Sequence, residues 1–171
     1  MKSTHEKLED DWKSYPGAQY CFSWLLRQVS GDLLRNNLQE FLPFALRFLD
    51  DWQLENKICA LHCLDHILDN VQKQDLTKFG HADVIQSALF HVQVHRDIEV
   101  LTVAYDCTFK FLQKTIPVKE PAKYDAWDEL TKKVGSMQFQ NYRYDIFIGA
   151  AYKICRLGGR WVGGLAPKTM D

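Results

Sequence analysis

The apolar residues between positions 42 and 71 follow the period of two consecutive α-helices separated by a short acidic turn. In the first helix, leucines recur at helical spacing and fall on one face: Leu42, Leu46 and Leu49. Asp50 and Asp51 close that helix. The next helix carries a broad apolar stripe: Ile58, Ala60, Leu61, Leu64, Ile67, Leu68 and Val71. We therefore predict two antiparallel helices packed through their apolar faces.

The same pattern recurs along the chain. A small residue on the second helix returns roughly every 44 to 46 residues: Ala60, Ala104 and Ala150 or Ala151. A cysteine follows each of them after three or four positions: Cys63, Cys107 and Cys155. This period is typical of HEAT repeats, in which each helical pair buries its apolar surface against the next pair. The predicted fold class is all-α, a HEAT-like α-α superhelix, that is, a solenoid of antiparallel helical pairs.

The breaks in this pattern predict the domain organisation. We expect one HEAT-like helical repeat domain over residues 1–157, with four units: about 18–36, 37–71, 82–112 and 124–157. Pro117 and Pro121 interrupt any helix and separate the last two units. Residues 158–171 contain four glycines and a proline, so we expect an irregular tail there.

Composition and charge argue against several classes of function. The 21 basic residues nearly balance the 22 acidic ones, which gives no general electrostatic reason to bind nucleic acid or an anionic membrane. No apolar run is long enough to span a bilayer, and the N-terminus is too polar for a secretory signal. The five cysteines are an odd number and fall within predicted helices, which favours reduced, mostly buried thiols. These features predict a soluble intracellular protein.

One cluster of potential metal ligands occurs within two turns of a helix: Cys59, His62, Cys63 and His66. Cysteine and histidine at this density are typical zinc ligands. Four ligands from consecutive turns of one straight helix would, however, point away from a common centre, so an exposed polar face is the favoured interpretation. A metal-binding helical protein built on these four residues remains the alternative, and stoichiometric zinc in purified protein would support it.

The chain has none of the common nucleophile or nucleotide-binding motifs, so we expect no enzymatic activity and no cofactor.

The second helices also carry polar residues beside their apolar stripes. We call this set the polar ridge and expect it to bind another protein: His62, Asp65, His66, Asp69, Glu99, Asp106, Lys110, Asp145 and Arg156. In a stack of helical pairs, the second helices line one continuous surface, which suits recognition of a partner's helices. The alternative is a set of merely solvated faces, because every amphipathic helix has one.

The segment that contains these residues resembles a known protein family. The stretch FLPFALRFLDDWQLENKICALHCLDHILDNV, continued by LTKFGHADVIQSALFHV, resembles the C-terminal HEAT-repeat part of the Tel-two-interacting protein 2 family, a subunit of the Triple-T co-chaperone complex. Several short segments carry it: Leu42-Pro43, Asp50-Asp51-Trp52, Glu55-Asn56-Lys57, Cys63-Leu64-Asp65-His66 and the run 80–89. Among these, the Glu-Asn-Lys and Leu-Asp-His segments discriminate best, because other HEAT proteins share the Leu-Pro and the acidic turn.

The resemblance implies a non-enzymatic scaffold or adaptor. Its implied partners are the sister subunits of the Triple-T complex and, indirectly, the ninety-kilodalton heat-shock chaperone machinery and the phosphatidylinositol-kinase-related kinases whose maturation and stability the complex supports. It also implies a location in the cytoplasm and nucleus. The balanced charge and the lack of a long apolar run predict no nucleic-acid or membrane partner. An unrelated HEAT adaptor, for example in nuclear transport or phosphatase scaffolding, is a further alternative.

Overall fold

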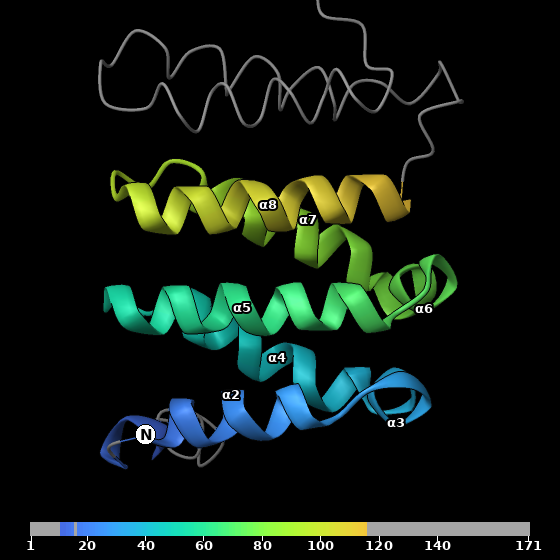
Figure 1. Cartoon of the computed structure of the whole chain (residues 1–171), viewed down its shortest axis with the longest axis horizontal. Coiled ribbons are helices and arrows are strands. Elements are labelled where there is room, and N and C mark those ends of the chain that lie inside the picture. The colour runs from blue at the N-terminus through green and yellow to red at the C-terminus, as the bar shows by residue number, and fades with distance from the viewer. Residues whose placement is uncertain (1–10, 16, 116–171) are drawn as a thin grey trace, which may run out of the picture. The chain divides into compact units, whose positions relative to one another are not determined.

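The computed structural model describes residues 11–15 and 17–115, and this part of the chain is helical, with no strand (Figure 1). The elements follow one another as η1 (Asp11–Ser14), α2 (Ala18–Gln28), α3 (Gly31–Asn36), α4 (Leu38–Leu49), α5 (Leu54–Asn70), α6 (Lys73–Thr77), η2 (Lys78–Gly80), α7 (His81–Val92) and α8 (Ile98–Thr115). None of these helices is long and apolar enough to cross a membrane. The predicted unit at 124–157 and the predicted tail at 158–171 lie outside the described residues.

The chain divides into two compact units, with the boundary between Cys107 and Thr108, inside α8. Of the second unit, Thr108–Thr115 are described, and they form the last two turns of α8. There the Thr115 hydroxyl donates a hydrogen bond to the Phe111 carbonyl, as is usual for a threonine within a helix.

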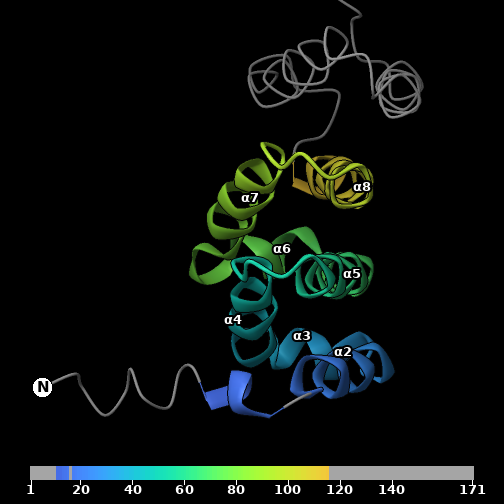
Figure 2. The ribbon, with the colours of Figure 1, turned by 90° about the vertical axis from the view of Figure 1, so that its left-hand side faces the viewer.

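The helices of the first unit lie in two layers (Figure 2). Helices α2 and α5 and the first part of α8 form one layer, and α4 and α7 form the other. Within the first layer the three helices run in the same direction, as the colours of Figure 1 indicate. Helix α5 contacts α2, α3 and α4, so it is central to the packing.

The apolar stripe that the sequence predicts on α5 is buried except at Ile58, which is half-buried and lines a surface cavity. Ala60, Leu61, Leu64, Ile67 and Leu68 have no exposed surface. Ala104 on α8 is equally buried. The Cys107 thiol donates a hydrogen bond to the Leu61 carbonyl at 3.3 Å and thereby links α8 to α5.

The turn between α4 and α5 is held by polar side chains. Asp50 is exposed, whereas Asp51 is 6% exposed and accepts hydrogen bonds from the Trp52 backbone N–H at 2.8 Å and from the Asn56 amide at 2.5 Å. The Lys57 ammonium donates to the Leu49 carbonyl at 2.8 Å, which satisfies a backbone group at the end of α4. Residues of the first turn of α5 thus fix the path of the chain out of α4.

Short helices occupy segments that the apolar pattern left unassigned. Helix α6 begins with a capping box, in which Gln72 and Asp75 satisfy each other's backbone N–H groups. Leu76 is completely buried and attaches α6 to the core. Gly80 follows with φ +72°, a left-handed conformation that glycine adopts without strain, and α7 begins at the next residue.

Candidate interaction groove

A cavity of about 430 Å³ opens on the surface of the first unit between α2, α5 and the start of α8. We call it the groove. Three helices supply its lining: Tyr20, Ser23 and Arg27 from α2, Leu54, Glu55, Ile58, Cys59 and His62 from α5, and Glu99 from α8. Two residues of the predicted polar ridge, His62 and Glu99, therefore line one cavity although they are 37 positions apart (99 − 62).

The contribution of α2 to the groove was not predicted from the sequence. Ser23 is 2% exposed, and its hydroxyl makes no hydrogen bond of ordinary geometry. The Arg27 guanidinium donates to the Ser23 carbonyl at 3.2 Å, which holds its charge beside the groove. The one available signal in the sequence was a serine, Ser23, on the same face of α2 as the buried Leu26. A buried hydroxyl without a hydrogen-bond partner is costly, so a serine on a buried face calls for an explanation.

Two thiols one turn apart on α5 differ in environment. Cys59 is half-buried at the groove, whereas Cys63 is completely buried. Cys63, Ser23 and Arg27 lower the pKa of Cys59 to about 6, with Cys63 as the largest cause, against the effect of burial. The interaction with Cys59, together with burial, raises the pKa of Cys63.

The residues of the polar ridge differ in how far their side chains are exposed. On α5, His62 and Asp69 are exposed, while Asp65 and His66 are half-buried. On α8, Glu99 and Asp106 are exposed and lie seven residues apart, on one face of the helix. Lys110, in the second unit, is half-buried. Asp145 and Arg156 lie outside the described residues.

His66 attaches α5 to the end of α2. Its Nε2 lies 2.7 Å from the Val29 carbonyl oxygen and donates to it, since a carbonyl can only accept. One turn later, the Asn70 side-chain oxygen accepts from the Gly31 N–H at 3.2 Å. The C-terminal half of α5 thus holds the turn between α2 and α3, and His66 has a structural role beside any role in binding.

His62 is exposed, whereas His66 is hydrogen-bonded to the Val29 carbonyl, and this difference can be tested by mutation. We expect His66→Ala to lower the free energy of unfolding by about 1 kcal/mol, because the Val29 carbonyl loses its partner. His62→Ala, one turn away at an exposed position, should change it by less than about 0.5 kcal/mol. Urea unfolding followed by circular dichroism measures both. Equal midpoints for the two variants would contradict the assignment of the His66 hydrogen bond.

The four residues of the metal-binding alternative do not form a site. Among the residues the structure describes, no group of three or more histidine, cysteine or acidic side chains is placed to hold a metal ion. Cys63 is buried in the core and His66 contacts the Val29 carbonyl, whereas Cys59 and His62 line the groove.

The outer face of α2 is unusually apolar. Tyr20, Trp24 and Leu25 are each more than half exposed, and Cys21 is exposed beside them. The expectation of mostly buried thiols is therefore wrong for Cys21, because it lies on the side of α2 away from the buried Ser23 and Leu26. Exposed apolar surface that is contiguous on one helix is typical of a contact region.

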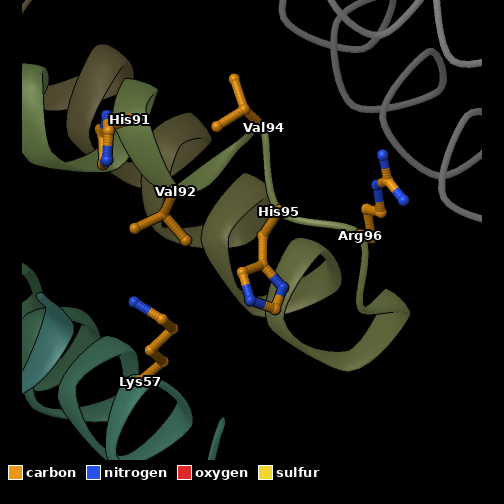
Figure 3. Close-up of a pocket in the computed structure, with 6 residues that line it drawn as sticks. All are labelled: Lys57, His91, Val92, Val94, His95 and Arg96. Atoms are coloured by element: carbon orange, nitrogen blue, oxygen red, sulfur yellow. The ribbon is translucent and has the colours of Figure 1, made fainter. Parts of the chain in front are cut away.

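A second cavity, of about 340 Å³, lies beside the loop that connects α7 to α8. Figure 3 shows Lys57, Val92 and His95 directed toward a common space, whereas Val94 and Arg96 point away from it. Lys57 already donates to the Leu49 carbonyl, and the His95 Nδ1 accepts from the Asp97 N–H at 3.1 Å. The polar groups directed into this cavity are thus used in local structure.

The fold and the groove define a layered helical protein with an open surface cavity of mixed polarity. The sequence matches the Tti2 family over residues 1–157, and the chain belongs to that family. It is 35% identical over 111 residues to TELO2-interacting protein 2 of Homo sapiens and 34% identical over the same length to the proteins of that name in Rattus norvegicus and Mus musculus. No solved structure matches the chain.

The matched region covers 63% of this chain but 22% of each mammalian protein. The chain thus spans about a fifth of the length of the curated relatives it matches. The family resemblance stated from the sequence is confirmed.

Proposed function

We propose that this chain is a non-enzymatic scaffold or adaptor, built as a HEAT-like solenoid of antiparallel helical pairs. In this proposal it binds the sister subunits of a Triple-T co-chaperone complex. It acts indirectly with the ninety-kilodalton heat-shock chaperone machinery to support the maturation and stability of phosphatidylinositol-kinase-related kinases, in the cytoplasm and nucleus. The observation that carries the proposal is membership of the Tti2 family, whose mammalian relatives are named for interaction with TELO2.

The groove supports a binding role on chemical grounds. Its walls combine apolar surface, from Tyr20, Leu54 and Ile58, with the exposed carboxylates of Glu55 and Glu99. A partner helix with apolar residues flanked by lysine or arginine would complement this surface. The acidic ridge residues farther along α5 and α8 extend the same charge.

A charge-reversal experiment tests whether the groove binds the partner. In the groove variant, Glu55→Lys and Glu99→Lys are combined. We expect co-purification of the sister subunits to weaken at least tenfold, because two attractive contacts become repulsive. Binding of the unaltered chain should also weaken as salt rises, since exposed charge pairs are screened over about 8 to 10 Å.

The other layer offers a closely matched control. Glu40→Lys and Asp83→Lys also reverse two exposed acidic residues, each in the first turn of its helix, as Glu55 and Glu99 are. Any cost from the helix dipole, about 0.3 to 1 kcal/mol per site, is therefore similar in the two variants. Undiminished binding of the groove variant, or equal loss in the control, would contradict the groove as the contact surface. Loss in the control alone would favour the α4 and α7 face.

A further inference from the structure

Phe79 is an exposed aromatic residue in an uncommon backbone conformation. It lies in η2, the turn between α6 and α7, beyond the C-terminal end of α5 (Figure 1). Its φ of +54° and ψ of +18° fall in the left-handed region, which no other residue apart from glycine enters within the described ranges 11–15 and 17–115. Bulky side chains rarely adopt this region because the Cβ comes too close to the following carbonyl oxygen. The backbone at position 79 therefore does not favour phenylalanine.

The packing of the unit does not call for this aromatic ring either. Phe79 is 78% exposed, and its ring contacts the His81 ring at a centroid distance of 5.9 Å. The apolar residue that attaches this segment to the core is Leu76, which is completely buried. Gly80 supplies the left-handed residue directly before α7. Because neither burial nor the turn explains a phenylalanine here, a contact outside the chain is the better explanation.

The segment 73–80, which carries the ring, is basic at its surface. Lys73 and Lys78 are exposed, whereas the one acidic residue of the segment, Asp75, is half-buried and engaged in the capping box of α6. The next exposed carboxylate in the chain is that of Asp83, on the first turn of α7. The segment thus combines an apolar ring with two exposed ammonium groups. An apolar pocket with carboxylates at its rim is the chemical complement of such a surface.

We propose that Phe79 is an anchor residue for a partner protein, whose apolar pocket, edged by carboxylates, takes up the phenyl ring. The partner assigned to this site is a sister subunit, an assignment that rests on the proposed function. An aromatic side chain has two rotatable bonds and loses little conformational entropy when it fills a pocket, and a few such anchors carry much of the affinity of many interfaces. No residue of η2 lines the groove, so the anchor gives the partner a second contact.

Substitutions at Phe79 in the full chain separate the role of the ring from that of the backbone. Phe79→Asn removes the ring and introduces a residue that tolerates the left-handed region. Its affinity for the purified, immobilised sister subunits should fall about tenfold or more, because the pocket loses its anchor. Its urea unfolding midpoint should stay unchanged or rise, because the backbone strain is relieved. Phe79→Tyr keeps the ring and should retain most of the affinity.

Two further variants test the specificity and the charge of the contact. Trp52 is a matched control, since it is an aromatic residue, 82% exposed, in the turn between α4 and α5. Trp52→Ala should leave the affinity unchanged. Lys73→Glu combined with Lys78→Glu should weaken binding several-fold, because carboxylates at the rim of the pocket would then be repelled. Equal losses in Trp52→Ala and Phe79→Asn, or full affinity in the double lysine variant, would contradict the proposed contact.

The remaining outcomes distinguish this site from the proposed function and from other occupants. Undiminished affinity of Phe79→Asn, or a marked fall in its urea midpoint, would overturn the anchor and leave the proposed function in place. If the unaltered chain does not bind the sister subunits, the proposed function and the anchor fall together. Sedimentation with phosphatidylcholine–phosphatidylserine vesicles and light scattering test a membrane and a second copy. Vesicle binding or dimerisation that Phe79→Asn abolishes, with subunit binding retained, would assign the ring to that occupant instead.

Discussion

Asp51→Ala is expected to lower the free energy of unfolding by about 2 to 4 kcal/mol. The carboxylate accepts hydrogen bonds from the Trp52 backbone and from the Asn56 amide, and the Lys13 ammonium lies 3.9 Å from it. Hydrogen bonds to a charged group are worth about 1.5 to 3 kcal/mol each, and the Asn56 amide would keep only the Gln53 side-chain oxygen as acceptor, at 3.1 Å. Asn56 is 2% exposed, so its amide would remain largely without solvent. Urea unfolding measures the difference.

The adjacent aspartate provides the control. Asp50→Ala removes the same group from an exposed position next to Asp51 and should cost less than about 0.5 kcal/mol. Asp51→Asn, which keeps one acceptor oxygen but removes the charge, should fall between the two. If Asp50→Ala and Asp51→Ala unfold at the same urea concentration, the buried carboxylate does not stabilise the turn.

The helices of the first unit could be predicted largely from apolar periodicity. The stripe on α5 is strong because its apolar residues recur over four turns, and those from Ala60 to Val71 are buried as predicted, whereas Ile58 is half-buried. The difference between Asp50 and Asp51 could not be predicted in this way. Both are acidic residues after a helix, and only the packing of α5 against the end of α4 decides which one is covered.

The short segments that best discriminate the family prove to be structural as well. Asn56 and Lys57 hold the turn between α4 and α5, and His66 binds the end of α2. From the sequence, His66 belonged to the polar ridge because it lies beside the apolar stripe of its helix. Its partner, the Val29 carbonyl, is 37 positions away, and no local pattern reveals it.

Only part of the groove lining could be predicted from the sequence, because contacts between distant helices are not visible in a local pattern. His62 and Glu99 follow from the polar faces of their own helices, but Tyr20, Ser23 and Arg27 depend on how α2 is placed against α5. Helix–helix packing is set by complementary side-chain shapes, which periodicity does not encode.

Leu64→Ala is expected to lower the free energy of unfolding by about 2 to 5 kcal/mol, through lost burial and the cavity that remains. Leu64 has no exposed surface and lies on α5, the helix that contacts α2, α3 and α4. Leu33→Ala on α3 deletes the same atoms at a position that is 61% exposed and should cost less than about 1 kcal/mol. Because both changes replace leucine by alanine within a helix, helix propensity contributes nearly equally to them. Urea unfolding of the two variants measures the difference, and a Leu64→Ala midpoint within error of that of Leu33→Ala would contradict the central position of α5 in the core.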